Sequence, residues 1–428
     1  MPDFVFLLET RLSPEQLRVV ERVQQAATHH GLHLYLVGGA LRDMIYGYPV
    51  RDLDFAVEGP AQKVIKSLLK NDVQVLQMNE KLRLADLQFP GDVTVEIAAC
   101  RAERRNRPGQ APVIDFAGIY EDLRRRDFSM NAIGLSLNPN SRGLLLDPNN
   151  GVADIERHEV RVLHNYSFLD DPVRIIRAVR FATRLRFTLE AKTESLFRSA
   201  LENRYIQSAA IPSLLKEFRE LAREDYAVDI LRTLAKEGLI TAFHPRLDGA
   251  RLNLHILAQA NKVREQFEDE GIALHFFGPF LHFLLAKLSA RERSDLVRRL
   301  GMKRADTDPW MHLPDQAKRL ATELTGKNGN TPSKAYQLLE KQPGELLLFL
   351  LLGGGPKKAV DKVKNYLHRQ RKARQTLPGA ELATLGVAPE SPRYQKILDA
   401  YFLGVLDGKV RASKDPLKAL KKLVNEIK

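Results

Sequence analysis

The chain has 428 residues, a formal net charge of +13, 44% hydrophobic residues and one cysteine. This length exceeds one ordinary hydrophobic core, so we expect two to four domains. The longest apolar run, Leu346 to Leu352, is far shorter than the ~20 residues of a membrane span, and the amino terminus has no basic-then-apolar signal segment. The composition therefore predicts a soluble cytoplasmic protein with no membrane partner. Cys100 stands alone, which excludes an intramolecular disulfide and a cysteine-based metal cluster, and we expect a buried thiol.

The first 140 residues alternate between helical and strand-like patterns. Ser13-Pro-Glu-Gln16 combines an N-cap, a proline in the first turn and a capping-box glutamine, which predicts a helix to about His30. Strands are expected at Leu34–Val37, Leu53–Val57, Val73–Gln77, Arg83–Phe89, Val93–Ala98 and Ala132–Leu137, with a helix near Ala61–Lys70. This order predicts an α/β head with a mixed sheet.

After about residue 150 the helical pattern dominates. Helices are expected at Pro172–Leu185, Lys192–Glu202, Ile211–Ala222 and Ala227–Glu237, and similar patterns continue to the end. Gly353-Gly-Gly-Pro356 is the clearest later break. We predict a head (1–140) followed by all-α neck (141–222), body (223–355) and tail (356–428) domains.

Positive charge is concentrated in the tail. Residues 357–428 contain 17 Lys and Arg and 7 Asp and Glu, a net charge of +10. Such an excess suits a polyanionic partner, because each phosphate contact releases counterions. A solvated, lysine-rich helical surface would have the same composition.

Two carboxylates share one face of the strand expected at Leu53–Val57. Asp52 and Asp54 alternate with Leu53 and Phe55, so the acidic pair points one way and the apolar pair turns toward the core. Unpaired carboxylates would repel, whereas Mg²⁺ removes the conflict and keeps waters that a phosphate can replace. A surface Asp-x-Asp would have the same spacing.

The residues before this strand predict a phosphate site. Gly38 and Gly39 let the backbone approach a ligand, and a helical pattern containing Arg42 follows. Free amides at a helix start favour anions. A Gly-Gly turn would explain the pair alone, but the pair together with the two carboxylates favours a nucleoside triphosphate with Mg²⁺.

Two further segments carry candidate site residues. Glu96, which alternates with Val95 and Ile97, either completes the metal site from a neighbouring strand or faces solvent. The segment Arg124-Arg-Arg-Asp-Phe-Ser-Met-Asn131 combines guanidinium groups with Asp127 and Asn131. Arginines form bidentate contacts with phosphate oxygens, and Asp127 and Asn131 suit sugar hydroxyls or hold an arginine in place. A basic surface turn leading into a helix is the alternative.

The segment Asp170-Asp-Pro-Val-Arg-Ile-Ile-Arg-Ala-Val-Arg-Phe181 is the second strong pattern. Pro172 suits a first helical turn with Asp171 as its N-cap, while Asp171 and Arg174 lie one turn apart. Together they present an acceptor and donors that match cytosine or adenine but not uracil or guanine. Arg177 and Arg180 continue the stripe and either hold phosphates or brace Asp154.

These motifs resemble the class II tRNA nucleotidyltransferases, the CCA-adding enzymes, and the related bacterial poly(A) polymerases. The ordered series that carries the resemblance runs over about residues 34–185 and consists of Leu36-Val-Gly-Gly-Ala-Leu-Arg-Asp43, Arg51-Asp-Leu-Asp54, Arg125-Arg-Asp-Phe-Ser-Met-Asn-Ala132, Asp147-Pro-Asn-Asn-Gly-Val-Ala-Asp154 and Asp170 to Phe181. The family implies Mg²⁺ on Asp52 and Asp54. It also implies that Arg126 and Asp127 bind the ribose, and that Asp171 and Arg174 select the base.

Other segments refine the comparison. Arg101–Pro112 is similar to the flexible loop that helps relatives change from C to A addition, which weighs against a CC-only enzyme. Pro378–Pro389 and Leu406–Val410 are similar to tails that grip tRNA. Ser208–Leu215 lacks the Glu-Arg pair that the family often carries, and no His-Asp phosphohydrolase signature follows, so we expect no phosphatase activity.

The resemblance predicts a Mg²⁺-dependent nucleotidyltransferase that adds CMP and AMP from CTP and ATP to the tRNA 3′ end by two-metal in-line attack. The predicted catalytic residues are Asp52 and Asp54, with Glu96 as a third metal ligand. The predicted nucleotide-binding residues are Gly38, Gly39, Arg42, Arg126, Asp127, Asn131, Asp171, Arg174, Arg177 and Arg180. The alternatives are an A-adding enzyme, a poly(A) polymerase, and an idle RNA-binding relative, against which the intact Asp52 and Asp54 argue.

Overall fold

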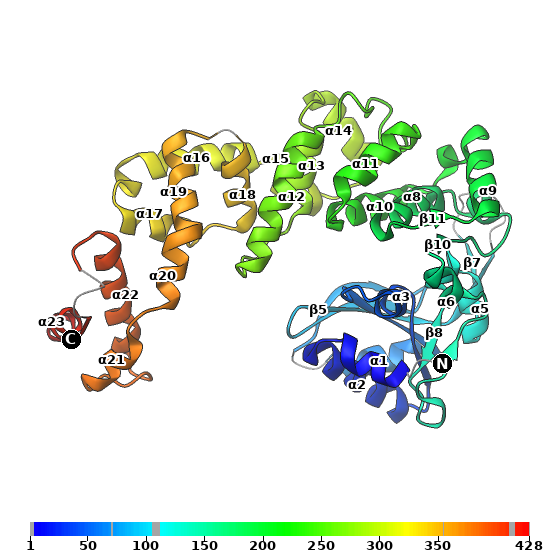
Figure 1. Ribbon diagram of the computed structural model, residues 1–428, viewed down its shortest axis with the longest axis horizontal. Helices are drawn as coiled ribbons and strands as arrows, with labels where there is room; N and C mark the ends of the chain where they lie inside the picture. The colour runs from blue at the N-terminus through cyan, green and yellow to red at the C-terminus, as the bar shows by residue number, and fades with distance from the viewer. Residues whose placement is uncertain (1–3, 70–71, 105–111, 354, 411–415, 428) are drawn as a thin grey trace. The chain divides into compact units, whose positions relative to one another are not determined.

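The computed structural model describes residues 4–69, 72–104, 112–353, 355–410 and 416–427. It divides into two compact units, Met1–Gly249 and Ala250–Lys428. The first contains every strand of the described residues, and the second is helical (Figure 1). This confirms the predicted fold class, an α/β head followed by helical domains. The finer division into head, neck, body and tail stays a prediction.

The main sheet of the first unit is mixed, as predicted. In the described residues its seven strands run in the order β3-β4-β5-β2-β1-β8-β9. Their bounds are β1 (His33–Val37), β2 (Asp52–Glu58), β3 (Gln74–Asn79), β4 (Leu84–Phe89), β5 (Val93–Ala99), β8 (Gly134–Ser136) and β9 (Leu145–Leu146). β2 and β5 pair in parallel, and the other neighbours pair antiparallel. Two short pairs lie apart, β6 (Arg101–Arg104) with β7 (Val113–Phe116) and β10 (Glu159–Val160) with β11 (Thr188–Leu189).

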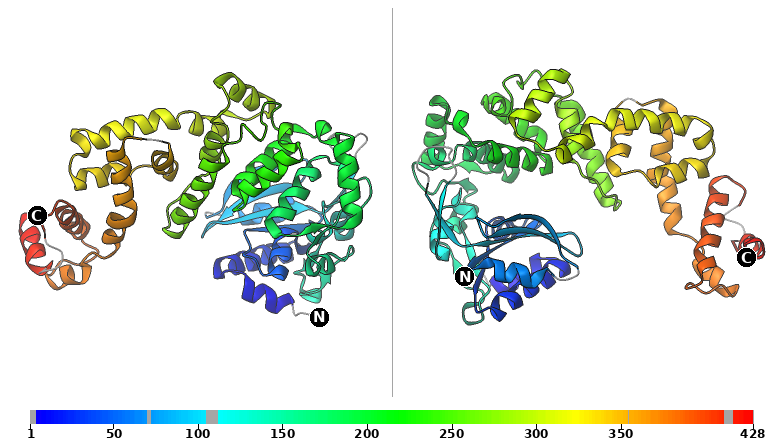
Figure 2. Two further views of the ribbon diagram at one scale, coloured as in Figure 1. Left: turned by 45° about the horizontal axis from the view of Figure 1, so that its top comes forward. Right: turned by 180° about the vertical axis from the view of Figure 1, so that it is seen from behind.

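The two faces of the main sheet differ in chemistry. One is apolar and includes Leu53, Phe55 and Leu87, each no more than 1% exposed. Helices α2 (Pro14–His29) and α4 (Ala61–Leu68) contact the strands of this sheet, and Figure 2 shows the blue N-terminal helices on one side of it. Alternation then places the polar residues of β2, β4 and β5 on the opposite face. The sheet thus has a core side and a polar side.

Helices of the first unit cover the head, the predicted neck and the start of the predicted body. They are α1 (Phe4–Arg11), α3 (Gly39–Tyr46), α5 (Ile119–Arg124), α6 (Gly151–Glu156), α7 (Ser167–Asp170), α8 (Val173–Leu185), α9 (Ala191–Glu202), α10 (Ile211–Arg223) and α11 (Ala227–Lys236), with 3₁₀ turns η1 (Ser129–Asn131), η2 (Pro139–Ser141), η3 (Tyr205–Ser208) and η4 (Leu239–Ala242). Ser13 and Gln16 form the predicted capping box of α2. Helix α8 contacts both α10 and α11, and Phe218 and Leu221 of α10 are fully buried.

The second unit is built from helices alone in its described residues. They are α12 (Leu254–Asp269), α13 (Phe277–Leu284), α14 (Ala290–Arg299), α15 (Arg304–Met311), α16 (Leu313–Thr325), α17 (Pro332–Leu339), α18 (Gly344–Leu352), α19 (Lys357–Asn365), α20 (Arg371–Gln375), α21 (Gly379–Thr384), α22 (Pro392–Leu406) and α23 (Pro416–Glu426), with the turn η5 (Lys327–Gly329) and the π-helical segment η6 (Tyr366–Gln370). The apolar run at Leu346 to Leu352 is the buried helix α18. None of the described helices is long and apolar enough to cross a membrane.

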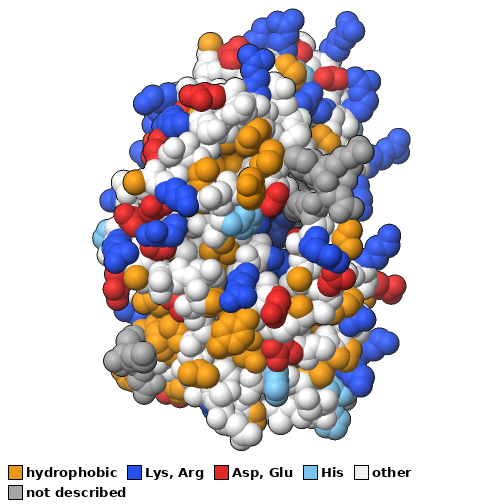
Figure 3. Space-filling model, turned by 90° about the vertical axis from the view of Figure 1, so that its right-hand side faces the viewer, with side chains coloured by type: hydrophobic (Ala, Val, Ile, Leu, Met, Phe, Trp, Pro, Cys, Tyr) orange, Lys and Arg blue, Asp and Glu red, His pale blue; other side chains and the backbone are white. Residues whose placement is uncertain are grey.

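Exposed basic side chains follow the helices near the carboxyl end. Lys357, Lys358, Lys364, Arg369 and Lys372 are exposed on α19, η6 and α20, so much of the charge excess in this segment faces solvent. Figure 3 shows a face of the molecule on which basic and acidic side chains are interspersed. Whether the exposed basic side chains of 357–372 bind a polyanion or only face solvent stays a prediction.

Two further predictions concern residues near β6. Cys100 is a buried, unpaired cysteine, and burial raises the pKa of its thiol, so the thiol is protected as predicted. The segment expected to form the flexible loop begins in β6 and ends just before β7. Its central residues, 105–111, lie outside the described residues.

Candidate active site

The polar side of the main sheet carries a row of carboxylates. Asp54 of β2 is the register partner of Glu96 on β5, and Glu96 is the partner of Asp86 on β4. Asp52 lies two residues before Asp54 on the same face of β2. The structure thus brings Glu96 to the face that holds the two predicted catalytic residues. Our sequence analysis missed Asp86, although its alternation with Ala85 and Leu87 was a visible signal.

Burial and like charge disfavour ionisation along this row. Burial, followed by the carboxylates of Glu96 and Asp52, raises the pKa of Asp54 to about 7, against the opposing guanidinium of Arg126. Burial and then Glu96 raise the pKa of Asp86 to about 6. A cation in this position would remove the repulsion between the carboxylates.

Arg223 of α10 already neutralises one end of the row. Its Nη2 donates to both carboxylate oxygens of Asp52, at 2.8 and 3.0 Å. Among the described residues, no group of three or more Asp, Glu, His or Cys side chains is arranged to hold a metal ion. Mg²⁺ commonly takes one or two carboxylates and fills its remaining positions with water and substrate phosphates. The donor set of Asp52 and Asp54 therefore fits Mg²⁺.

The backbone between β1 and α3 approaches the row closely. Gly38 has a φ of +74°, and a Cβ built on it would lie 3.2 Å from Oδ2 of Asp54 and 3.0 Å from Nη1 of Arg126. Both the backbone conformation and the narrow space thus require glycine here. A Cβ on Gly39 would make only an ordinary contact with Arg42. Gly38 precedes α3 without a side-chain cap, so the amides at the start of this helix are available to an anion.

Polar residues predicted to contact nucleotide bind one another in a chain. Asn131 Nδ2 donates to Asp127 Oδ1 at 3.0 Å, and Arg42 Nη1 donates to Asn131 Oδ1 at 2.6 Å. Arg42 Nε also donates to Asp43 Oδ1 at 2.8 Å. The Arg42 side chain is buried, so this guanidinium is committed to holding the turn after Gly38 in place.

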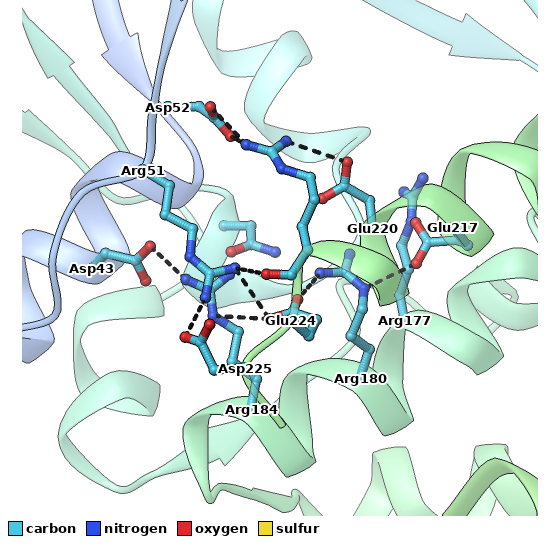
Figure 4. Close-up of polar contacts among 12 residues, drawn as sticks. Asp43, Arg51, Asp52, Arg177, Arg180, Arg184, Glu217, Glu220, Glu224 and Asp225 are labelled. Atoms are coloured by element: carbon cyan, nitrogen blue, oxygen red, sulfur yellow. Dashed lines mark hydrogen bonds and ion pairs between the residues drawn. The ribbon is translucent and has the colours of Figure 1, made fainter. Parts of the chain in front are cut away.

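Arginines of α8 continue this chain and close it through α10 (Figure 4). The contacts are Arg177 to Asp127 at 3.6 Å, Arg177 and Arg180 to Glu217 at 2.6 and 3.1 Å, Arg180 and Arg184 to Glu224 at 2.8 and 3.7 Å, and Arg184 to Asp43 at 3.1 Å. Burial raises the pKa of Glu217, but the adjacent arginines outweigh burial and hold that pKa below its usual value. We call this set the arginine ring.

The arginine ring corrects one expectation from the sequence. Arg177 and Arg180 do not brace Asp154, whose carboxylate accepts from Ser129 Oγ at 2.5 Å and from Arg161. Besides Asp127, their carboxylate partners are Glu217 of α10 and Glu224, the residue that follows this helix. The signal in the sequence was the spacing of Glu217, Glu220 and Glu224, which lie three and four residues apart, about one helical turn.

The row and the ring face one cavity of about 540 Å³ in the first unit. Its lining includes the predicted residues Gly38, Gly39, Arg42, Asp52, Asp54, Glu96, Arg126, Asp127, Asn131, Arg177 and Arg180. It also includes residues that our sequence analysis did not single out, namely Asp43, Arg51, Leu76, Gln77, Asp86, Thr94, Phe181, Arg184, Lys216, Glu217, Glu220 and Arg223. Arg126 is held at the edge of the cavity by Asp122, at 3.0 Å.

Asp171 and Arg174 are not part of this lining. Arg174 donates to Ser167 Oγ at 2.6 Å and to the carbonyl of Arg125 at 2.8 Å, and its Nε lies 3.9 Å from Asp171 Oδ2. It lines a second cavity of about 290 Å³ together with Asp170. Asp171 is also not the N-cap of α8. It ends α7, and Pro172 occupies the cap position without a side-chain hydrogen bond.

The fold and this site agree with comparisons to known proteins. Residues 34–161, which span β1 to the start of the helical region, match the family model described as the poly A polymerase head domain. Residues 34–161 therefore carry a head domain of this family, which confirms the resemblance to it and to the class II tRNA nucleotidyltransferases that the motifs predicted.

Three relatives are named A-adding tRNA nucleotidyltransferases. The protein of Aquifex aeolicus is 31% identical over 80% of this chain and 41% of its own length. The protein of Geobacter sulfurreducens is 26% identical over 99% of this chain and 49% of its own length. This chain thus spans less than half of each. The protein of Halalkalibacterium halodurans is 28% identical over 99% of this chain and 96% of its own length.

Solved structures share the fold along the chain. A Thermotoga maritima CCA-adding enzyme complexed with tRNA matches 99% of this chain and 98% of its own, with a TM-score of 0.52 and 25% identity. A CCA-adding enzyme in complex with ATP matches 99% and 96%, also with a TM-score of 0.52 and 25% identity.

Asp54→Asn should change how stability depends on pH. Folding raises the pKa of Asp54 to about 7 from an ordinary 3.8, so the folded state binds the additional proton and the free energy of unfolding falls as pH rises between these values. The free energy of unfolding of the variant should therefore exceed that of the unmodified protein by on the order of 4 kcal/mol above pH 7, and by little near pH 4. Urea unfolding across this pH range measures the difference. Asp92→Asn, an exposed change in the turn between β4 and β5, is the control. If stability changed with pH in the same way in Asp54→Asn and in the unmodified protein, the prediction would be contradicted.

Arg223→Gln should strengthen binding of a divalent ion. Removing the guanidinium frees both oxygens of Asp52, and an exposed ion pair of this kind is worth enough to change affinity by about two- to fivefold. Mn²⁺ titration followed by electron paramagnetic resonance, without nucleotide, measures the dissociation constant. Arg232→Gln removes an ion pair on α11 and should leave the dissociation constant for Mn²⁺ unchanged. Equal affinities in all three proteins would show that Arg223 does not compete with the ion.

Proposed function

We propose that this chain is a Mg²⁺-dependent nucleotidyltransferase that adds nucleotides from CTP and ATP to the 3′ end of tRNA. The observation that carries the proposal is the alignment of Asp54 with Glu96, beside Asp52 and next to the backbone of Gly38. Carboxylates for a metal and amides for a phosphate thereby face one cavity. The resemblance to this family supports the same reaction.

The proposed reaction exchanges one phosphate ester bond for another. The 3′ hydroxyl oxygen of the RNA bonds to the α-phosphorus, the bond from that phosphorus to the bridging oxygen breaks, pyrophosphate leaves, and the hydroxyl proton passes to water. Mg²⁺ held by Asp52 and Asp54 would polarise the hydroxyl and neutralise charge on the phosphates. The amides at the start of α3 hold the phosphates, and Arg126 adds positive charge beside them.

Residues just before η1 and at the start of α8 would recognise the nucleoside. Arg126 and Asp127 contact the ribose, and Asp171 with Arg174 selects the base. The separation of 3.9 Å between the last two side chains supports this role, because a base edge needs its acceptor and donor side by side. The arginine ring fixes the orientation of α8, so Arg177 and Arg180 act through Glu217 as well as through any phosphate they meet.

Two specificities fit the proposal. Full CCA addition follows from the motifs, and solved CCA-adding enzymes share the fold. Addition of A alone is the second candidate, because the three relatives reported above are named A-adding enzymes. The tail supports a tRNA substrate in either case, since its exposed basic residues suit a long phosphate backbone.

Transfer assays on staged acceptors should separate these activities. We expect labelled CTP and ATP, with Mg²⁺, to extend tRNA transcripts that end before the tail, after C and after CC, in the order C, C, A. Extension of the CC end alone would indicate an A-adding enzyme. Long A tracts on unrelated RNA would indicate a poly(A) polymerase, and no transfer to any RNA would leave only an RNA-binding protein.

Asp52→Ala should abolish transfer and preserve RNA binding. The change removes a metal ligand, so we expect the rate constant at saturating substrates to fall more than about a hundredfold. Filter binding of the same transcript should give an unchanged dissociation constant, because the basic tail is untouched. Asp229→Ala, an exposed change on α11, is the matched control. A parallel loss of RNA binding in Asp52→Ala would instead identify a residue needed for folding.

A further inference from the structure

The edge strand β3 has an irregularity where it borders the cavity. Val75 pairs with Leu87 of β4, and Gln77 pairs with the next residue back, Asp86, so Leu76 has no partner in β4 and forms a bulge. Regular alternation would turn Leu76 and Gln77 to opposite faces. Both nevertheless line the cavity, because a bulge changes the direction of a side chain.

Leu76 is an exposed apolar side chain in a charged surrounding. It is 55% exposed, and the neighbouring positions on the cavity face of the sheet are occupied by Asp86, Glu96 and Thr94. A ligand that covers Leu76 would remove this apolar surface from water, which is favourable. The adjacent carboxylates of Asp86 and Glu96 disfavour an anionic group directly against Leu76, so an uncharged group of the ligand suits this position.

The order of the strands separates the cavity into two flanks. Gly38 follows β1, which lies beside β2 on the side away from β5, so the amides assigned to the phosphates lie on that flank of β2. Leu76 lies on the other flank, two strands beyond the carboxylate of Glu96 on β5. An in-line displacement requires the attacking oxygen and the leaving pyrophosphate to lie on opposite sides of the α-phosphorus. The acceptor therefore enters over β4 and β3.

We propose that Leu76 and Gln77 bind the terminal nucleoside of the RNA acceptor. Leu76 packs against the face of the base, and the Gln77 amide hydrogen-bonds to its edge or its ribose. The inference rests on the proposed function and deepens it, because it assigns the acceptor end to a site separate from that of the incoming nucleotide. The bulge is the feature that brings both side chains to this site.

Leu76→Ala tests the site through its effect on one substrate. With a tRNA transcript that ends in CC, and ATP, we expect kcat/KM for the RNA to fall about tenfold, as expected when a leucine side chain loses a contact that buries it. KM for ATP should stay within about twofold, because the nucleotide lies on the other flank. Leu76→Met keeps the apolar surface and should restore most of the activity. Val75→Ala, the adjacent residue paired with Leu87, is the matched control.

A crosslink provides a second measurement that does not depend on rates. A transcript carrying 4-thiouridine as its terminal residue should, on irradiation, attach to the peptide that contains Gln74–Asn79. Attachment to Arg124–Asn131 instead would overturn the assignment. Equal kcat/KM values for Leu76→Ala and Val75→Ala would also overturn it and leave the proposed function standing. Absence of transfer by the unmodified chain would overturn both.

Discussion

Repulsion among carboxylates on one face of the sheet is the constraint on which the site depends. The register of β2, β5 and β4 fixes Asp54, Glu96 and Asp86 in one row, and burial raises the cost of their charge. The protein offsets part of this cost with Arg126 beside the row and Arg223 on Asp52. The remaining negative charge gives a divalent ion with its nucleotide a reason to bind there.

The arginine ring joins the helices to this face of the sheet. Each arginine of the ring contacts at least one carboxylate. Glu217 pairs with two arginines, and Glu224 pairs with three when Arg51 is included. Removing one partner from such a set leaves an uncompensated buried charge, which costs far more than an exposed ion pair is worth. The ring therefore holds α8, and the residues proposed to read the base, in a fixed place beside Gly38.

The sequence predicted most of the head because its signals are local. Alternation identified the strand with Asp52 and Asp54, and the capping box identified α2. The alternation placed Glu96 on one face of its strand but did not show which strand lies beside it, because strand order depends on contacts between residues distant in the chain. The same limit hid Glu217, which lies 40 residues from Arg177 in sequence and 2.6 Å from it in space. Asp171 was wrongly expected to cap α8 because α7, which it terminates, is too short to leave a pattern.

The bulge in β3 also bears on how this cavity can diversify. Without Leu76, Val75 and Gln77 would be adjacent, and β3 would pair with β4 without interruption. The carboxylate row would not change. An edge strand has a neighbour on one side only, so a gain or loss of one residue there is absorbed locally. Such insertions and deletions can change the residues at the edge of the cavity in related proteins while the carboxylate row stays the same.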